Sequence, residues 1–400
     1  MKYTFIVIIT VLLVLPFACA NQQETAHKPQ PTAEKPPAAT GNVTPVSSIL
    51  EDGNALDATT FSKKVREGGG DVSFVFSDDR PFAQCHASTI TQAPDGTIIT
   101  AWFAGTKEKH SDVGIWMSKR KNTTWTPPKL AAKVEESAHW NPVLFTDAEG
   151  IVYLFFKVGP EISHWRTYWM QSLDNGGTWT EACALVPGDA GGRGPVKNKP
   201  IILSDDSWLA PASTEQDGWE AFADKSTNKG KTWQRSENFY IDRKKLRGKG
   251  AIQPTFWESA PGNVHALLRT ASGNVWQTDS TDYGATWSPV YEIGLPNNNS
   301  GLDVLQLEDG RLLLVLNPVG VNWGPRTPLS LALSCDNGLS WTLIAHLEDD
   351  PIETKHEYSY PSIIRTKSGI AISYTWRRER VRCWMINDKT LAAIAASENL

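Results

Sequence analysis

Short apolar segments alternate with polar turns along most of the chain. Residues 141–147 form one such segment, a turn that ends at Gly150 follows, and residues 152–157 form the next. Apolar segments of this length, bounded by turn residues, are typical of β-strands. The pattern recurs at regular intervals and therefore predicts an all-β protein. The first strand of each interval is expected at residues 85–93, 141–147, 199–204, 253–258, 302–307 and 361–366.

One eight-residue motif closes successive intervals. Its general form is Ser-x-Asp-x-Gly-x-Thr-Trp; near-complete copies lie at residues 172–179, 226–233, 280–287 and 334–341, and a degenerate copy lies at 118–125. The near-complete copies start 54 residues apart, and a fixed period of this size indicates a repeat architecture. Asp or Asn shortly before Gly favours a tight turn. We therefore expect the motif to lock a hairpin rather than to take part in catalysis.

The repeated units predict a β-propeller, in which four-stranded sheets surround a central channel. Six first strands indicate six blades, and seven blades are the less favoured alternative. The last unit is one strand short and carries no motif, and residues 71–76 could supply the missing strand. Both ends of the chain would then close the ring. The propeller domain is expected to span residues 46–400.

The N-terminal residues have a different character. Lys2 precedes an apolar run that ends in Ala18-Cys19-Ala20, which predicts an export signal over residues 1–20. Cys19 is a candidate lipidation site of a bacterial lipoprotein, and a small-residue cleavage site is the alternative. Residues 21–45 are rich in Gln, Thr, Pro and Ala and are expected to form a disordered tether. The protein is therefore expected to be a cell-surface or periplasmic lipoprotein, or to be secreted.

The net charge and the cysteine content indicate which partners, disulfides and metal sites to expect. The formal net charge is −5 and the chain has no basic runs, so nucleic acid is not an expected partner. Cys85, Cys183, Cys335 and Cys383 could form two disulfides or remain buried thiols, and no Cys/His spacing matches a zinc site. We expect no metal, no cofactor and a monomer, with membrane contact only through an acylated Cys19.

Equivalent positions of successive blades converge at one mouth of a propeller channel. The two sets of positions that matter are the entrances to the first strands and the loops between second and third strands. They carry many cationic and polar side chains, namely His86, His110, His139, Arg166, Lys197, Asn198, Arg269, Arg326, Tyr358 and Arg377. Arg binds carboxylates through paired, charge-assisted hydrogen bonds. The set therefore predicts that the ligand is an acidic oligosaccharide or polysaccharide.

Seven further stretches carry a resemblance to a known family. They are residues 85–90 (CHASTI), 101–106 (AWFAGT), 139–143 (HWNPV), 194–200 (GPVKNKP), 299–303 (NSGLD), 357–361 (EYSYP) and 374–378 (YTWRR). Together with the repeated motif, which resembles the Asp box, they make residues 80–387 resemble the sialidase-like superfamily of Asp-box (BNR repeat) propellers, of the type called predicted neuraminidases.

This resemblance implies a glycosidase site. Sialidases use three Arg on the substrate carboxylate, a Tyr nucleophile backed by Glu, and an Asp acid. In this chain His86 stands in the place of the first Arg. The candidates for the other roles are Arg269, Arg326 or Arg377 for the carboxylate, Tyr358 for the nucleophile and Asp112 for the acid.

A second resemblance favours elimination. Propeller polysaccharide lyases that act on ulvan or on rhamnosyl-glucuronate linkages use two His, a Tyr and Arg around a uronic acid, and His86, His110 and Arg166 occur here in a similar order. The resemblance implies that Arg166 neutralises the carboxylate and that the two His transfer protons, with His139 in support. Our leading hypothesis is a lyase that acts on a uronate. An exo-glycosidase, sialidase-like or a rhamnosidase acting next to glucuronate, is the alternative, and a non-catalytic glycan-binding lipoprotein is the third hypothesis.

Overall fold

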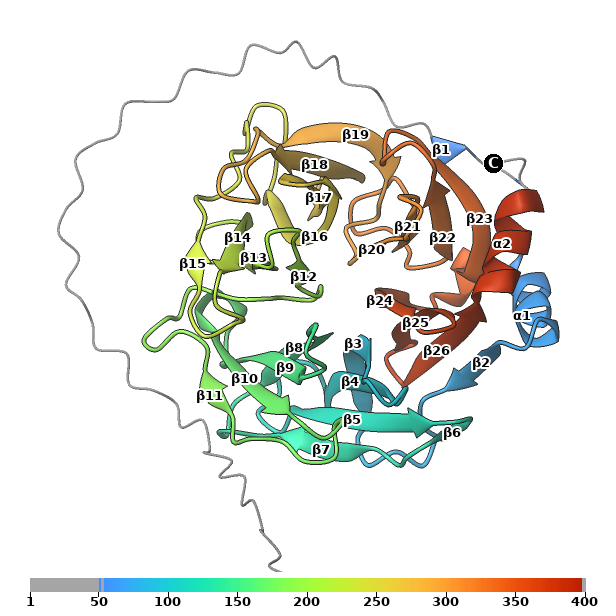
Figure 1. Cartoon of the computed structure of the whole chain (residues 1–400), viewed down its shortest axis with the longest axis horizontal. Coiled ribbons are helices and arrows are strands. Elements are labelled where there is room, and N and C mark those ends of the chain that lie inside the picture. The colour runs from blue at the N-terminus through green and yellow to red at the C-terminus, as the bar shows by residue number, and fades with distance from the viewer. Residues whose placement is uncertain (1–49, 52–53, 398–400) are drawn as a thin grey trace, which may run out of the picture. The chain divides into compact units, whose positions relative to one another are not determined.

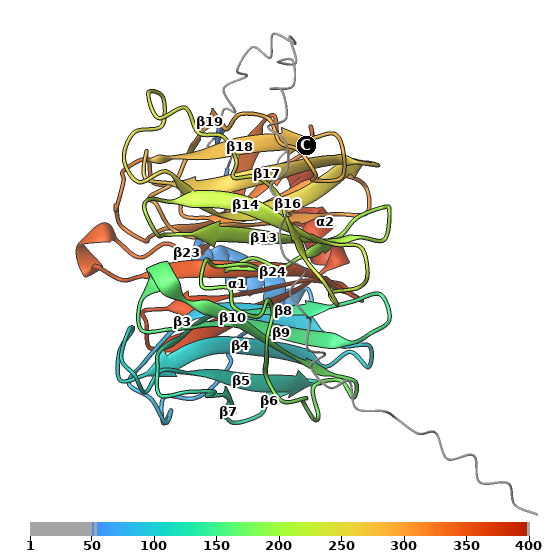
Figure 2. The same cartoon turned by 90° about the vertical axis from the view of Figure 1, so that its left-hand side faces the viewer.

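The computed structural model describes residues 50–51 and 54–397, which form a ring of six β-sheets (Figure 1). The strands of each sheet pair antiparallel, except for one short N-terminal strand, and Figure 2 shows the ring from the side. The prediction of an all-β, six-bladed propeller is confirmed. The expected export signal, Cys19 and the tether lie outside the described residues. Within the described part of the chain, no helix is long and apolar enough to cross a membrane.

The blades follow one another in chain order, and each runs outward from the channel. The innermost strands are β3 (Gln84–Gln92), β8 (His139–Thr146), β12 (Ile201–Ile202), β16 (Ala251–Ala260), β20 (Asp303–Gln306) and β24 (Tyr358–Thr366). The second strands are β4 (Ile98–Gly105), β9 (Val152–Val158), β13 (Trp208–Thr214), β17 (Asn263–Thr270), β21 (Leu312–Leu316) and β25 (Gly369–Trp376). The third strands are β5 (Gly114–Lys121), β10 (Arg166–Ser172), β14 (Glu220–Ser226), β18 (Asn274–Ser280), β22 (Leu329–Ser334) and β26 (Arg380–Asn387). The outer strands are β6 (Thr124–Trp125) with β7 (Lys129–Ala132), β11 (Cys183–Ala184), β15 (Gln234–Arg235), β19 (Tyr291–Pro296), β23 (Trp341–Glu348) and β2 (Asp71–Phe74).

The last blade is completed by a strand from the other end of the chain. β2 pairs with β26 in antiparallel register, with Asp71 opposite Met385 and Phe74 opposite Arg382. The expectation that residues 71–76 supply the missing strand is thus confirmed, although the strand ends at Phe74. A short strand, β1 (Leu50–Glu51), also pairs in parallel with β23 of the fifth blade. N-terminal segments therefore hold the two C-terminal blades.

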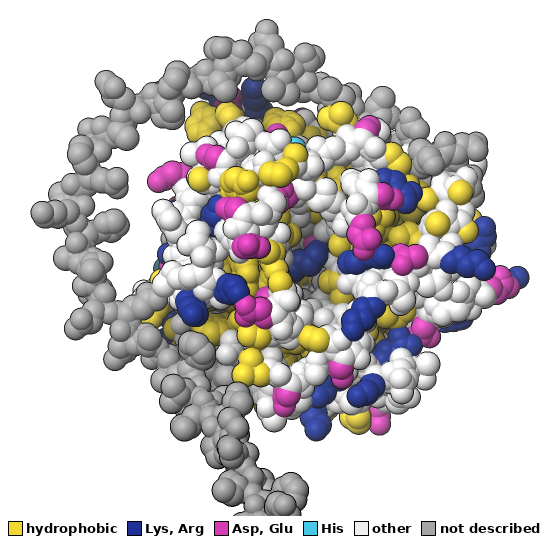
Figure 3. Space-filling view, in the orientation of Figure 1, with side chains coloured by type: hydrophobic (Ala, Val, Ile, Leu, Met, Phe, Trp, Pro, Cys, Tyr) yellow, Lys and Arg dark blue, Asp and Glu magenta, His cyan; other side chains and the backbone are white. Residues whose placement is uncertain are grey.

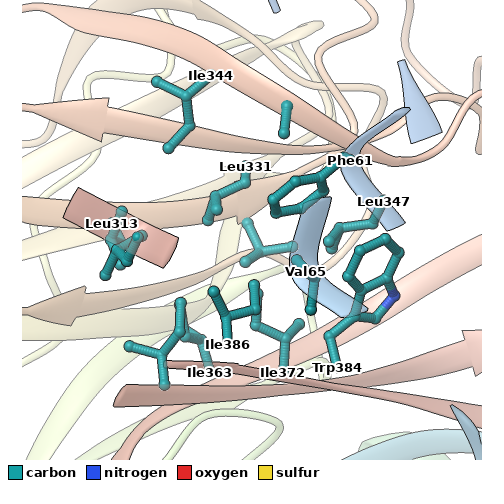
Figure 4. Close-up of a cluster of buried hydrophobic side chains, with 14 of the residues drawn as sticks. Phe61, Val65, Leu313, Leu331, Ile344, Leu347, Ile363, Ile372, Trp384 and Ile386 are labelled. Carbon is teal, nitrogen blue, oxygen red and sulfur yellow. The ribbon is translucent and has the colours of Figure 1, made fainter. Parts of the chain in front are cut away.

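Two helices that the strand pattern did not predict cover the outside of these two blades. The side chain of Asp57 caps α1 (Ala58–Glu67) by accepting a hydrogen bond from Thr60 N at 2.8 Å. Phe61 of α1 belongs to the same buried cluster as apolar residues of α2 (Asp388–Ser397) and of β26. Its ring stacks on Trp384, with 4.9 Å between the ring centroids (Figure 4). The helices thus bury an apolar surface on the outer strands.

The repeated motif folds as its turn chemistry predicts. In the copy at residues 172–179, Ser172 Oγ accepts a hydrogen bond from Gly176 N at 2.8 Å, and Asp174 accepts one from Thr178 N at 2.7 Å. The same pair of hydrogen bonds recurs in the other three near-complete copies. Each tip also contacts the preceding blade, as when Lys119 Nζ donates to Gly176 O at 2.8 Å. The motif therefore fastens blades together.

Three of the cysteines carry free thiols. They are Cys85 and Cys383, which are buried, and Cys335, which is exposed. The four cysteines considered above therefore do not form two disulfides. Burial raises the pKa of the Cys383 thiol to about 12, and it also raises the pKa of Cys85. Both buried thiols are accordingly protonated and unreactive at neutral pH.

Replacement of Phe61 by Ala should destabilise the propeller by about 3–5 kcal/mol, because it leaves a cavity between α1 and Trp384. The free energy of unfolding in urea measures this effect. Lys63→Ala on the exposed side of the same helix is the matched control and should change it by less than about 0.5 kcal/mol. Equal stability of the two variants would mean that α1 does not support the ring.

Candidate functional site

Each blade has one residue in the left-handed backbone region where its chain enters the innermost strand. These residues are Ala87, Asn141, Lys197, Gln253, Asn299 and Tyr360, with φ between 38° and 65°. In four blades the register between the first and second strands shifts at this point, as in a β-bulge. Bulges redirect side chains and are common next to active sites. We call this end of the channel the mouth.

Tyr360 lies in a hydrogen-bond network at the mouth that joins three blades. Arg269 Nη1 donates to Tyr360 Oη at 2.7 Å and to Gln253 Oε1 at 3.1 Å. Arg269 Nε donates to Asn299 Oδ1 at 2.8 Å. The Arg269 side chain is buried, and three acceptors fix the orientation of its guanidinium. The network therefore holds the Tyr360 hydroxyl in a defined position.

The Glu357 carboxylate pairs with two further arginines beside Tyr360. Arg326 Nη1 donates to Glu357 Oε1 at 2.6 Å, and Arg378 Nε donates to the same atom at 2.8 Å. Burial acts to raise the pKa of Glu357, but the two guanidinium groups outweigh it and the pKa lies below its usual value. Glu357 is therefore ionised at neutral pH. The Arg326 guanidinium also lies 5.9 Å from the ring centroid of Tyr360.

His86 contacts Tyr360 from the first blade. The ring centroids of the two residues are 4.3 Å apart, and His86 is 3% exposed. Burial and, to a smaller extent, three nearby arginines lower the pKa of His86 well below its usual value, so the imidazole is neutral at neutral pH. Its Nδ1 has no hydrogen-bond partner and lies 3.9 Å from Glu357 Oε1. An unpaired, neutral imidazole next to Tyr360 is a candidate base.

A carboxyl group and two tryptophans border Arg269. Burial raises the pKa of Glu215 above its usual value, although Arg269 acts in the opposite direction. The Arg269 guanidinium carbon lies 5.2 Å from the ring centroid of Trp219 and 5.9 Å from that of Trp323. Trp219 is buried, whereas Trp323 is 58% exposed. A carboxyl with a raised pKa is a candidate proton donor, and the exposed indole offers an apolar surface beside the polar network.

Lys197 and Asn198, predicted as substrate-binding residues, are buried beneath this network. Lys197 Nζ crosses the channel and donates to Leu302 O at 2.7 Å and to Pro361 O at 2.6 Å. Burial lowers the pKa of Lys197 to about 7. Asn198 Nδ2 donates to the carbonyls of Gln253 and Pro254 at 3.1 and 2.9 Å. Because protein acceptors occupy these groups, we revise their role from substrate binding to support of the mouth.

His139 is also enclosed by the protein. Its Nε2 accepts a hydrogen bond from Val134 N at 2.9 Å, and its Nδ1 donates to Ser137 O at 2.8 Å. Its side chain is fully buried and stacks on Phe156. Burial lowers the pKa of His139 to about 4. Both ring nitrogens are used by the backbone, so the geometry does not favour a supporting role in proton transfer.

His110 and Arg166 pair with acidic neighbours rather than with His86 or with each other. His110 Nδ1 pairs with Asp112 Oδ1 at 2.7 Å on the loop between β4 and β5, and its side chain is half-exposed. Arg166 donates to both oxygens of Glu135 at 2.6 and 2.7 Å. Among the described residues, no hydrogen bond, ion pair or ring contact joins any two members of the predicted trio.

Tyr358 and Arg377 form a separate cluster. The Tyr358 side chain is buried and its hydroxyl donates to Asp350 Oδ2. Arg377 Nη2 donates to the same oxygen at 2.9 Å, and Arg377 Nε donates to Tyr358 Oη at 3.2 Å. His356 completes the cluster. Tyr360, two residues further on, is the tyrosine that meets Arg269, so we transfer the expected tyrosine role from Tyr358 to Tyr360.

His86, Arg269 and Arg326 could therefore be predicted from the sequence, whereas Tyr360, Glu357 and Glu215 had no predicted role. A signal for Tyr360 was present, since Tyr360-Pro361 occupies the same place in its blade as Asn141-Pro142 and Gln253-Pro254 do in theirs. No comparable signal marks Glu357, because its partners Arg326 and Arg378 come from loops that only the fold brings together.

No group of three or more His, Cys, Asp or Glu side chains that could hold a metal ion lies among the described residues. On the face that Figure 3 shows, basic and acidic side chains are interspersed rather than gathered in one patch. At the mouth, the Glu357 carboxylate is paired with Arg326 and Arg378.

The free energy of unfolding should fall by up to about 3 kcal/mol as the pH is lowered from about 6.5 to about 4, through His139 alone. The reason is that the unfolded chain binds a proton in this range that native His139 does not. Urea denaturation of the wild type and of His139→Gln at several pH values measures it. The variant should show a shallower dependence, and parallel curves would contradict the account.

Solved structures with a similar fold include three from different sources. They are a Hadza microbial sialidase (TM-score 0.66, 15% identity, covering 80% of this chain and 68% of that one), a Trypanosoma rangeli sialidase (0.64, 13%, 82% and 61%) and a protein of unknown function from Dyadobacter fermentans (0.62, 15%, 79% and 98%). At these identities the similarity shows the fold alone. No curated protein matches the chain in sequence.

A family model described as a BNR repeat-like domain matches residues 96–372. The match covers five of the six first strands completely and includes all the near-complete copies of the motif. It agrees with the resemblance to the sialidase-like propellers that the motifs indicated. The chain belongs to the family of BNR repeat-like domain proteins.

Proposed function

We propose that the protein is a carbohydrate-active enzyme that acts at the mouth on a carboxylate-bearing sugar, with Tyr360 as the reacting group. The observation that carries the proposal is the hydrogen bond of 2.7 Å from Arg269 Nη1 to Tyr360 Oη. A hydrogen bond from a guanidinium stabilises negative charge on the phenolic oxygen. The fold shared with sialidases supports such an activity by analogy.

The charges at the mouth favour a ligand with one carboxylate. The acceptors of Arg269 are Gln253, Asn299 and Tyr360, which are uncharged in their ordinary forms, so its positive charge is not cancelled by these contacts. Arg326, in contrast, is already paired with Glu357. A sugar carboxylate would therefore pair first with Arg269 and could gain Arg326 only in competition with Glu357. A sugar with one carboxylate, such as a uronate, fits this arrangement of charges.

Hydrolysis through a covalent intermediate is the mechanism that we favour. Tyr360 Oη attacks the anomeric carbon while Glu215, whose pKa burial raises above its usual value, is the candidate donor of a proton to the leaving oxygen. Water then releases the sugar from Tyr360. Gln253 Nε2 lies 3.4 Å from Tyr360 Oη, but an amide cannot accept the hydroxyl proton as a carboxylate would. Neutral His86, in ring contact with Tyr360, is the candidate base for that step.

Elimination remains the second candidate, and His86 is the observation that favours it. A neutral imidazole with an unpaired nitrogen can remove the C5 proton of a uronate; the bond from C4 to the leaving oxygen then breaks, and that oxygen takes a proton from the Tyr360 hydroxyl. Arg269 would stabilise the enolate-like charge on the carboxylate. In this elimination mechanism His110 and Arg166 do not have their predicted roles, because they are bonded to Asp112 and Glu135.

We further propose that the enzyme is exported and anchored through Cys19.

Tyr360→Phe should lower kcat on the active substrate by about 10³-fold or more, because the variant lacks the reacting oxygen. Turnover of uronate-containing oligosaccharides measures the loss. Tyr358→Phe is the matched control, two residues away and bonded to Asp350 instead of Arg269, and should keep most of the activity. If the control loses as much activity as Tyr360→Phe, Tyr360 is not the reacting group.

The products separate the two mechanisms. Hydrolysis should release a reducing sugar without new ultraviolet absorbance, whereas elimination would give an unsaturated uronate that absorbs in the ultraviolet. The measurement is absorbance and mass of the products from a panel of uronate and sialic acid glycosides. A product with the mass of added water supports hydrolysis. Binding without any product would favour the non-catalytic alternative and would contradict both mechanisms.

A further inference from the structure

A serine, a histidine and an aspartate are linked in series at the far end of the fourth blade. Ser259 Oγ lies 2.8 Å from His265 Nε2, and His265 Nδ1 lies 2.6 Å from Asp279 Oδ1. The three residues come from β16, β17 and β18, and His265 stands directly opposite Asp279 in the sheet. Adjacent strands thus hold the group, which lies outside the mouth network.

Neighbouring groups fix the orientation of His265. Asn337 Oδ1 accepts a hydrogen bond from Trp257 Nε1 at 2.7 Å, so the amide nitrogen of Asn337 faces His265 Nε2 at 3.3 Å. Because an amide nitrogen only donates, Nε2 must act as an acceptor and carries no proton. The proton of the neutral ring therefore resides on Nδ1 and is donated to Asp279. This is the tautomer that a general base for a serine hydroxyl requires.

Asp279 is equipped to hold an imidazolium. Its carboxylate accepts hydrogen bonds from Tyr291 Oη at 2.7 Å and from Gln277 Nε2 at 2.8 Å, in addition to His265. Burial acts to raise the pKa of Asp279, but these hydrogen bonds outweigh it and lower the pKa below its usual value. The carboxylate is therefore ionised and fixed in place.

Ser259 is accessible from solvent and distant in the fold from Tyr360. Its side chain is exposed at the end of β16, whereas Gln253, which belongs to the mouth network, lies near the start of the same strand. The nearby Asn337 belongs to the repeated motif of the fifth blade. The group consequently lies on the face of the propeller opposite the mouth.

We propose that Ser259, His265 and Asp279 form a second, esterase-type catalytic site that hydrolyses a carboxylic ester. Ser259 Oγ attacks the ester carbonyl carbon as its proton passes to His265 Nε2. The bond from the carbonyl carbon to the alcohol oxygen breaks, and the alcohol leaves with the proton from His265. Water then attacks the acyl-serine with His265 as base, which releases the carboxylic acid and restores Ser259. The Asn337 amide is the candidate donor to the oxyanion.

A fluorophosphonate probe tests this site directly, because it labels serines that a general base activates. Intact protein should gain one label, and peptide mass spectrometry should locate it on Ser259. Ser259→Ala should abolish labelling, and His265→Gln and Asp279→Asn should slow it by about 100-fold or more. The same variants should lose hydrolysis of p-nitrophenyl acetate in the same order.

Two controls show whether labelling requires an activated serine rather than merely an exposed one, and whether it depends on the mouth. Ser204, whose hydroxyl donates to Glu258 without a histidine, should not be labelled. Tyr360→Phe should be labelled at the wild-type rate, since the two sites lie on opposite faces. Absence of label from Ser259 in folded wild-type protein, or unchanged labelling in both His265→Gln and Asp279→Asn, would overturn the proposal and would leave the three residues as a structural hydrogen-bond network.

Discussion

The buried carboxylate of Asp303 is the interaction on which the mouth depends. It accepts hydrogen bonds from Lys199 Nζ at 2.9 Å, from Thr255 Oγ1 at 2.8 Å and from Ile363 N at 2.9 Å. These donors belong to the third, fourth and sixth blades, while Asp303 itself begins the innermost strand of the fifth. The Asp303 carboxylate is fully buried, and a buried charge has to be matched by such contacts because an unpaired one is strongly destabilising. One side chain thus sets the spacing of four blades.

Two residues of the mouth network lie within a few residues of these contacts. Thr255 follows Gln253 by two residues, and Ile363 follows Tyr360 by three. Each bulge lies between the residue that contacts Asp303 and the mouth. The contact with Asp303 therefore holds the strand on one side of the bulge, and the bulge turns the strand outward on the side of the mouth. This arrangement explains how a tyrosine in the left-handed backbone region, at φ 53°, is held in place. Strain at the bulge is balanced by the packing and hydrogen bonds beneath it.

Much of the fold could be predicted from the sequence, and less of the site. The 54-residue period and the turn residues were sufficient for six blades, and the missing strand of the last blade pointed to residues 71–76. Helix α1 could not be predicted from the pattern, because Phe61 and Val65 are the only buried hydrophobic residues on it. Equivalent positions in a repeat predict a common face, which gave His86, Arg269 and Arg326. Equivalent positions do not predict which side chains form hydrogen bonds to other protein groups, as those of Lys197, His139 and Arg166 do.

The pairing of charges also separates this mouth from the sialidase pattern that the motifs suggest. His86 stands where an arginine was expected, and Glu357 already engages Arg326 and Arg378. What remains for a ligand is one arginine, Arg269, next to a tyrosine hydroxyl. The solved structures that share the fold include sialidases, but the fold does not determine the substrate, which must follow from this smaller positive charge.

A crystal structure of the Tyr360→Phe variant soaked with glucuronic acid, and in a second crystal with N-acetylneuraminic acid, tests the central claim most directly. The account predicts that the sugar carboxylate lies within hydrogen-bond distance of the Arg269 guanidinium, with the sugar ring over the Phe that replaces Tyr360. A carboxylate bound at Arg166 instead of Arg269, or an empty mouth at saturating concentrations of both sugars, would contradict it.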